Sequence, residues 1–592
     1  MAPAIPSAEL RLSYPLYALD FDPEDADRLL VGGGGGAARS GVGNKISVLD
    51  VSHADALQVL SEIELSRDED SVNTLAVGSR RNNAIEFYAG INSAEDDLKK
   101  GKNEHFRVFA ADLPPKAKAA PSITELSRSA LFTTKDAEAY QRLLRISGPF
   151  GAAATGTIGR SKDAQIAIFD LAAPNSSNPA PKLRGEVELA KEAMDMDLMQ
   201  ISDDEHQLIY CDDYDIYTLI ITKKSISGPH LVFTVPHDVA TGAKERPSFR
   251  CIRFLTPTFV LAVANLPKPG GAVVQGFRLP KIADLGSEEK EGKARLAVVT
   301  HLPKSVTRAT GLAVRNLSPP ATLSTPQEDT QFVIAVTGQD SSITLFTLEH
   351  QTLGAVNLIA NLHPVTTLKE VHLGPISGLA FSRLTKTKTP PSHLRLASIG
   401  SMANTAIVHT LPLKPHKTHP TRPVLALKSR APSGTSFLVG TALFFALIAL
   451  LLQSFLEVKG YSRSVVGARS VTPVSWHRPG AYYALSTTTG IPPVVNGLWG
   501  MYNEKQAAAA AGGAGGGKVV LHHDAHLGEV GVEGHDEERH GEVKVWEELG
   551  PAQREAWRKV LEKAGHWGEQ TGEAVFKGVL FGQIAGVVGA MV

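Results

Sequence analysis

The sequence contains very little cysteine, only Cys211 and Cys251 in a chain of 592 residues. So few cysteines exclude a disulfide scaffold and a cysteine-based zinc site, and they suit a reducing compartment. Net charge is also nearly absent, since 60 basic residues stand against 61 acidic ones. Because non-specific binding to nucleic acid depends on an excess of positive charge, we expect no nucleic-acid partner.

We also expect no cleavable secretory signal peptide, because residues 1–12 contain no apolar run. One long uncharged apolar run does occur, from Ala431 to Leu456. About 20 apolar residues cross the hydrocarbon core of a bilayer, so the run predicts a transmembrane helix over residues 432–456. A buried core helix is the alternative interpretation.

More basic residues precede this segment than follow it, and the side of a membrane helix with more lysine and arginine is usually the cytosolic one. The upstream residues are Lys414, Lys417, Arg422, Lys428 and Arg430, and the downstream ones are Lys459, Arg463 and Arg469. The bias predicts a single-pass protein with a cytosolic N-terminal domain, residues 1–428, and a lumenal tail, residues 457–592. In the tail we expect a low-complexity linker at 506–517 and an amphipathic helix at 551–567.

A strand-rich unit recurs through residues 1–428, with short β-branched or alternating runs between Gly, Asp, Asn and Pro. Seven units begin near residues 16, 73, 143, 196, 251, 311 and 377. Seven four-stranded sheets arranged radially form an all-β fold, a WD-repeat-like β-propeller. A strand near Glu9–Tyr14 is expected to complete the last sheet. An array of β-sandwiches is the alternative.

The most unusual segment is a glycine-rich loop between two predicted strands, with five consecutive glycines at 32–36 and two more at 41 and 43. Glycine has no Cβ, so such a backbone can approach another molecule closely. A dinucleotide-binding fingerprint would need a helix after the loop, and the spacing leaves no room for one. A phosphate-binding P-loop would need a following Gly-Lys-Ser/Thr, which is missing. We also find no recognisable catalytic motif, so we do not expect an enzyme with covalent chemistry.

Three segments together resemble one known family. They are Tyr14-Pro15-Leu16-Tyr17, Leu30-Val31-Gly32-Gly33-Gly34-Gly35 and Gly41-Val42-Gly43-Asn44-Lys45-Ile46. They are similar to the first blade of the ER-membrane guanine nucleotide exchange factors for the Sar-family small GTPase, which start COPII coat assembly. The mammalian member of this family is called prolactin regulatory element-binding protein. The resemblance covers roughly residues 10 to 456.

The resemblance implies a function and a site. The function is release of GDP and loading of GTP on a Sar-type GTPase at the ER membrane, for ER-to-Golgi transport, with other COPII components as further partners. The loop would bind a potassium ion through the backbone of Gly34, Gly35, Gly36, Gly41 and Gly43. The residues contacting the GTPase would be Asn44, Val42 and Lys45, with Asn44 the side chain most needed for exchange.

A second function remains open at this stage. A membrane-tethered propeller could act as a scaffold that gathers coat or tether proteins without any exchange activity. Composition and repeats do not separate the two functions. The loop does, because a scaffold would tolerate a shortened glycine run and an exchange factor would not.

Overall fold

The structure is a computed structural model of the whole chain. It describes residues 5–37, 41–81, 84–113, 121–134, 136, 138–157, 163–173, 176–237, 245–267, 270–286, 292–354, 356–384, 391–427, 434–462, 464–477, 493–511, 518–524, 529–567, 576 and 578–582. Contacts divide the chain into two compact units, Met1–Ala431 and Pro432–Val592.

The first unit is a seven-bladed β-propeller, counted over its described residues. Six blades are antiparallel sheets of four consecutive strands. Blades 1 to 3 are formed by β2 (Leu16–Phe21), β3 (Arg28–Gly33), β4 (Asn44–Asp50), β5 (Gln58–Leu65); β6 (Thr74–Arg81), β7 (Ala84–Gly90), β8 (Phe106–Asp112), β9 (Ser122–Ser129); and β10 (Ala139–Ser147), β11 (Phe150–Thr157), β12 (Ala164–Asp170), β13 (Lys182–Leu189).

Blades 4 to 6 follow the same order. Their strands are β14 (Asp195–Gln200), β15 (Glu205–Cys211), β16 (Asp215–Thr222), β17 (Ile226–Thr234); β18 (Ser248–Thr256), β19 (Phe259–Asn265), β20 (Ala272–Arg278), β21 (Arg295–His301); and β22 (Ala309–Asn316), β23 (Thr330–Gly338), β24 (Ile343–Leu353), β25 (Val356–Leu368). A short helix α1 (Glu95–Lys99) lies in blade 2, and a 3-10 turn η1 (Ile282–Asp284) lies in blade 5.

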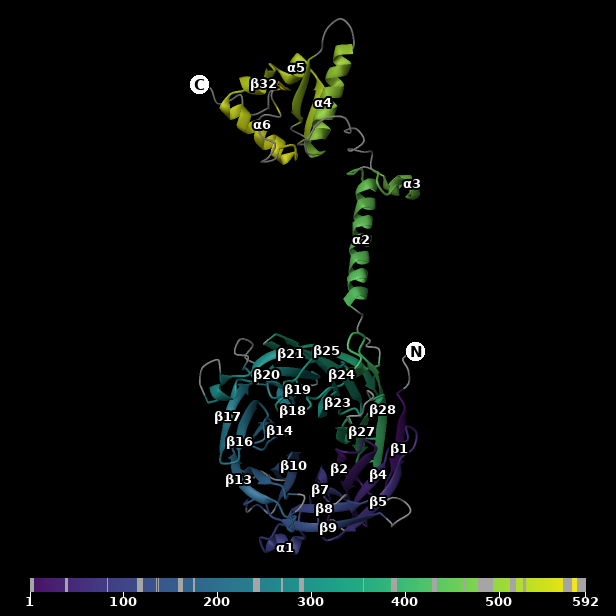
Figure 1. Cartoon of the computed structure of the whole chain (residues 1–592). Helices are drawn as coiled ribbons and strands as arrows, with labels where there is room; N and C mark the ends of the chain where they lie inside the picture. Colours follow the sequence, from purple (N-terminus) through teal and green to yellow (C-terminus); the bar gives the residue numbers. More distant parts are fainter. Residues whose placement is uncertain are drawn as a thin grey trace. The chain divides into compact units, whose positions relative to one another are not determined.

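The seventh blade closes the ring with both ends of the domain. It contains β26 (Ile376–Phe381), β27 (His393–Gly400) and β28 (Thr405–Pro415), and its outer strand is β1 (Ser7–Arg11), paired with β28. The expected closing strand is therefore confirmed. A short strand, β29 (Pro423–Leu425), also pairs with β28. Figure 1 shows the first strands of the blades near the centre of the ring and the last strands at its rim.

The blades hold together because the strands bury apolar side chains on both faces. In blade 6, for example, β23 reads Thr-Gln-Phe-Val-Ile-Ala-Val-Thr-Gly, and its middle residues are fully buried between neighbouring sheets. Val336 belongs to a core shared with blade 5, whereas Val333 belongs to a core shared with blade 7. Strands buried on both faces favour continuous apolar runs over strict alternation.

The propeller has two ends. The links between second and third strands, such as the glycine loop of blade 1, lie at one end together with the links from one blade to the next. Leu12 N–H, in the link before blade 1, donates to the carbonyl of Asn404 in the β27–β28 turn. We call this the loop end. β28 runs from Thr405 at the loop end to Pro415 at the opposite end, where β29 pairs with it. We call that the exit end.

The second unit begins with α2 (Gly434–Val458), which contains one span long and apolar enough to cross a membrane. This span is Leu438–Val458, 21 residues with mean hydropathy 2.2 and none of its window buried. The remaining described elements are α3 (Ala468–Val471), η3 (Val474–Trp476), α4 (Pro493–Ala511), β30 (Val519–Asp524), β31 (Glu529–Gly534), α5 (Glu537–His540), β32 (Lys544–Val545), η4 (Trp546–Glu548), α6 (Pro551–Lys563) and β33 (Leu580–Phe581).

The tail is a small folded module, with the sheet order β31-β30-β33-β32. Trp557 and Leu561 of α6 are buried in its core beside Trp546 and Phe581. Of the low-complexity linker expected at 506–517, residues 506–511 belong to α4 and residues 512–517 lie outside the described residues. Alanine is the strongest helix former, so a run of alanines extends this helix although its composition is simple.

Candidate functional site: the glycine loop of the first blade

The glycine-rich loop joins β3 to β4 at the loop end of blade 1. Its described residues are 34–37 and 41–43. Gly33 and Gly34 pack against the preceding blade link, since Gly34 N–H donates to the Pro15 carbonyl at 3.0 Å. A Cβ added to Gly33 would lie 1.8 Å from that carbonyl oxygen. Only glycine fits here, and the loop leaves the sheet along a fixed path.

Asn44 closes the other side of the loop. Its Oδ1 accepts a hydrogen bond from Gly36 N–H at 2.9 Å. Its Nδ2 donates to the carbonyls of Ser66 and Glu69 at 3.0 and 2.9 Å. The side chain is fully buried. Asn44 therefore ties the glycine run to residues 66–69, which link blade 1 to blade 2.

Gly34 has a φ of +144° and Gly36 a φ of +68°, values that favour glycine. A Cβ on Gly34 would lie 2.2 Å from Asn44 Oδ1. A Cβ on Gly36 would lie 3.1 Å from a carboxylate oxygen of Asp70. Two constraints therefore favour glycine at both positions. One is the positive φ, and the other is the close approach of Asn44 to Gly34 and of Asp70 to Gly36.

The segment that receives Asn44 is itself anchored by a buried ion-pair network. Glu69 accepts from Arg107 at 2.7 Å and from Arg128 at 2.6 Å. Arg107 is fully buried. Burial alone would raise the pKa of Glu69, but the hydrogen bonds and charges of the two arginines outweigh it, and the pKa is lowered. The loop of blade 1 is therefore connected through Asn44 and Glu69 to strands β8 and β9 of blade 2.

Val42 and Lys45 occupy different surroundings. Val42 is half-buried and packs against the apolar core that blade 1 shares with blade 7. Lys45 Nζ lies 2.6 Å from Glu62 on the neighbouring strand β5, and its side chain is one-fifth exposed. Glu62 also accepts from Ser47. Both predicted contact residues thus have partners within blade 1.

The contact predicted between Asn44 and a partner stays a prediction. In this structure the Asn44 side chain is fully buried and both ends of its amide are hydrogen-bonded within the chain. It positions the loop, and any effect on a partner passes through the backbone that it holds. The five predicted glycines lie together in this loop, with Gly41 exposed and Gly34 buried. Sequence reasoning missed Glu69 and Arg107, because nothing in their local pattern shows that they meet.

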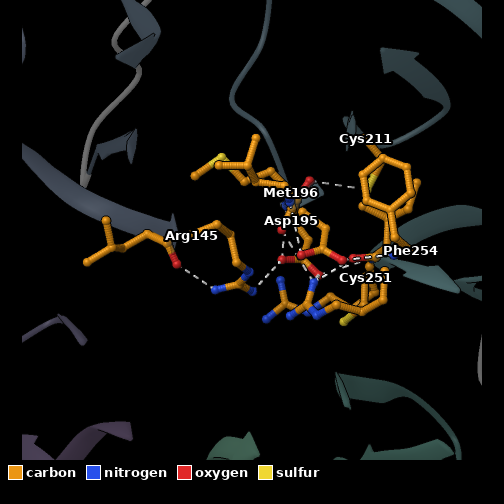
Figure 2. A network of polar contacts seen from close by, with 12 residues as sticks. Arg145, Asp195, Met196, Cys211, Cys251 and Phe254 are labelled. Atoms are coloured by element: carbon orange, nitrogen blue, oxygen red, sulfur yellow. Dashed lines mark hydrogen bonds and ion pairs between the residues drawn. The ribbon is translucent and has the colours of Figure 1, made fainter. Parts of the chain in front are cut away.

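A second cluster of polar groups lies at the centre of the propeller, where a cavity of about 310 Å³ is lined by the first strands of the blades. Figure 2 shows its main network. Asp195 of β14 accepts from Arg145 of β10 at 3.2 Å, from Ile252 N–H of β18 at 3.0 Å, and from Arg253. These contacts join three consecutive blades. We interpret the network as a structural clamp across blades 3 to 5.

The two cysteines lie beside this clamp. Cys211 Sγ donates to the Asp195 carbonyl at 3.8 Å, and both thiols are buried. Burial raises the pKa of Cys251 to about 12 and also raises that of Cys211. A thiol with a raised pKa is a poor nucleophile. The pair therefore behaves as small apolar residues of the core.

The tail contains the one group of potential metal ligands among the described residues. The ligand atoms of His522, Glu533 and His540 lie within 4.8 Å of one another. However, His540 Nδ1 accepts a hydrogen bond from Asp536 N–H at 3.0 Å. In a neutral imidazole this leaves the proton on Nε2, which lies 3.8 Å from Glu533. The arrangement favours a histidine–glutamate pair over a metal centre.

Comparison with known proteins gives only distant similarity. No family model matches the chain, and no curated protein matches it. Among solved structures, Saccharomyces cerevisiae Sqt1 is 7% identical with a TM-score of 0.35, covering 69% of this chain and 100% of that one. Drosophila Semaphorin 1b, extracellular domains 1–2, is 10% identical with a TM-score of 0.29, covering 69% and 87%. A glucose dehydrogenase is 10% identical with a TM-score of 0.31, covering 68% and 98%. The propeller assignment accordingly rests on the strand order itself.

Proposed function

We propose that this chain is a guanine nucleotide exchange factor for a Sar-type small GTPase, held at the ER membrane by α2 and acting at the start of COPII coat assembly. The observation that carries the proposal is the glycine loop of blade 1, whose backbone is fixed at both ends by Pro15 and Asn44. The family resemblance of the same segment supplies the identity of the partner.

A pre-shaped loop suits this activity. An exchange factor binds the nucleotide-free GTPase more tightly than the loaded one, and by linkage it weakens nucleotide affinity by the same factor. No bond to the nucleotide has to be made or broken by the factor. Loop residues whose backbone is already held, such as Gly34 and Gly36, lose little conformational entropy on docking, which leaves more binding energy for displacing the nucleotide.

Exposed apolar residues near the loop give the proposed partner a surface to bind. Leu373 is 77% exposed in the β25–β26 link, and Met402 is 72% exposed in the β27–β28 turn. The two lie close together, since a Cβ on Gly374 would meet Met402 Sδ at 2.5 Å. The Met402 turn adjoins the link that holds Gly34. Clusters of exposed apolar residues are typical of protein interaction sites.

The resemblance also implies a potassium ion in the loop, and the donor chemistry fits. A carboxylate oxygen of Asp70 lies beside Gly36, and the Asn44 oxygen accepts from Gly36 N–H; hard cations prefer oxygen ligands of this kind. Backbone carbonyls of Gly34 to Gly36 and of Gly41 and Gly43 would complete the set. When bound, the ion would cross-link the two halves of the loop.

Release of a fluorescent GDP analogue from the Sar-type GTPase, measured with the full chain in proteoliposomes, tests the proposal. We expect acceleration by the wild type and a large loss with Gly34→Ala. Asn316→Ala is the control, because Asn316 is the last residue of β22 at the exit end, and its replacement should leave the rate unchanged. Equal release rates with and without the wild-type chain would contradict exchange activity. Binding of coat proteins without any acceleration would support the scaffold function instead.

The cation dependence gives an independent test. Replacing K⁺ by Na⁺ or Li⁺ at constant ionic strength should slow exchange, because smaller ions match a carbonyl cage of this kind less well. A rate that is the same in all three salts would remove the potassium ion from the proposal while leaving the exchange activity standing.

A further inference from the structure

One hairpin of the propeller is longer than the others. β24 has 11 residues, against 7 in β20 and 8 in β16, the corresponding strands of the two preceding blades. The first residue of β23, Thr330, pairs with His350, so residues 351–353 of β24 extend past its neighbour. Three residues of strand add about 10 Å. The tip of the β24–β25 hairpin therefore projects at the exit end.

This tip is apolar and exposed. Leu353 is 62% exposed, Val356 48% and Leu358 41%. Val356 pairs directly with Leu353, and Leu358 follows two residues later, so all three lie on one face of the hairpin. The opposite face packs inward, where Ile359 contacts the backbone of Gly276 in blade 5. Exposed apolar side chains grouped on a projecting tip are typical of an interaction site.

Basic residues flank the tip on both sides. In blade 5, Arg278 donates to the Asn357 carbonyl of the hairpin, and it lines a cavity of about 280 Å³ together with Lys281, Lys293 and Arg295. In blade 7, Lys414 and Lys417 are exposed near the β28–β29 turn. Acidic groups also occur here: Asp284 lines the same cavity, Glu328 and Asp329 adjoin the tip, and Glu349 pairs with Arg422. Among these described residues, basic side chains outnumber acidic ones.

The chain leaves the propeller beside this hairpin. Arg422 pairs with Glu349 of β24, and Leu425 N–H donates to the Gln331 side chain of β23 at 2.7 Å. Glu349 and Leu353 lie on the same face of β24, because they are four residues apart. Only six residues then separate Leu427 from α2. A chain of that length reaches at most about 25 Å.

We propose that the exit end of the propeller docks on an anionic bilayer, the same membrane that α2 spans, with the tip Leu353, Val356 and Leu358 entering the interface. The basic residues Arg278, Lys281, Lys293 and Arg295 bind lipid headgroups beside it. Apolar residues that insert shallowly and lysines or arginines that bind anionic headgroups are the two features of interfacial membrane binding. The short connection to α2 keeps this end within reach of the headgroups.

A single fluorophore on the full chain tests the proposal. Both native cysteines are buried, so an environment-sensitive label such as NBD attaches selectively to Leu353→Cys. The matched control is Leu373→Cys, which is 77% exposed, against 62% for Leu353, but lies at the loop end. Each protein is reconstituted into vesicles of phosphatidylcholine alone or with phosphatidylserine, and carbonate extraction checks that α2 is inserted.

We expect the label at residue 353, and not at 373, to shift to the blue and to be quenched by lipids that carry a quencher in the acyl chain. The shift should be larger with phosphatidylserine, and the charge reversals Lys281→Glu and Arg295→Glu together should remove that difference. Emission at residue 353 equal to that at 373 would overturn the docking proposal. Equal shifts in both lipids, unchanged by the charge reversals, would overturn the role of the basic residues. If carbonate extracts the chain from the vesicles, α2 does not span the bilayer, and the docking proposal is overturned.

Discussion

Replacing Asn44 by alanine should loosen the glycine loop without unfolding the propeller. The substitution removes three hydrogen bonds, one to Gly36 N–H and two to the carbonyls of Ser66 and Glu69. At about 1 kcal/mol for each bond, the closed loop loses about 3 kcal/mol relative to an open one. Since about 1.4 kcal/mol corresponds to a factor of ten, amide exchange at Gly36 should accelerate about 100-fold.

The effect on the whole domain should be small. A propeller of this size unfolds with an entropy near 0.9 kcal/mol per kelvin, so a loss of about 3 kcal/mol lowers the Tm by about 3 °C. Hydrogen exchange followed by mass spectrometry on peptides covering residues 30–37, together with thermal unfolding, measures both quantities. Nucleotide release measured on the same samples then relates loop order to exchange activity.

Asn44→Asp tests whether the hydrogen bonds of the Asn44 amide, rather than the size of its side chain, hold the loop. The aspartate keeps the oxygen that accepts from Gly36 N–H, but it places a second oxygen against the carbonyls of Ser66 and Glu69. Two acceptors facing each other in a buried site are repulsive, and a buried charge adds a further penalty. We therefore expect Asn44→Asp to loosen the loop at least as much as Asn44→Ala. Wild-type protection at Gly36 in either variant would refute the reasoning.

Three further predictions follow from the same geometry. Gly34→Ala should lower the Tm and expose the loop to proteolysis, because its Cβ would collide with a buried side chain. Gly41→Ala should cost less, since a Cβ there meets nothing within 4 Å and only the φ of +78° opposes alanine. Glu69→Gln should destabilise the propeller by about 3–5 kcal/mol in chemical unfolding, because it leaves the buried Arg107 with only the more distant carboxylate of Glu125, at 3.9 Å; an unchanged midpoint would contradict that. Acid should destabilise the domain as pH falls from 6.5 to about 4, because burial lowers the pKa of His372 and His409 to about 4 and the unfolded chain binds more protons throughout that window. Measured as Tm against pH, the loss should shrink in His372→Gln and in His409→Gln, and an identical pH profile would refute it.

The sequence was sufficient to predict the propeller, because its information is periodic. Each blade repeats strands separated by turn residues, so seven approximate units are detectable even where each one is weak. The closing strand could also be predicted near residues 9–14, and it lies at Ser7–Arg11. The small displacement reflects how poorly a short alternating run defines its own ends.

The details of the loop could not be predicted in the same way. The glycine run was identified from its local pattern and Asn44 from the family resemblance, but the hydrogen bonds of Asn44 depend on two carbonyls more than twenty residues away. An exposed turn asparagine and a buried one look alike in sequence. The same limit applies to Arg107, which reads as one strand residue among others until the fold places it against Glu69. Long-range contacts of this kind carry no periodic signal.

The two ends of the propeller suggest how one domain would serve the two proposed contacts. Strands of six to eight residues span about 20–25 Å, so the loop end and the exit end are separated by roughly that distance. The clamp of Asp195 with Arg145 and Arg253 joins neighbouring blades at the centre, which limits how far they can move relative to one another. If the exit end docks on lipid, the glycine loop is held at a fixed height above the membrane. A GTPase that is also attached to the membrane would then meet the loop at one height only, so docking would raise the exchange rate by orienting the loop, even though lipid never touches it.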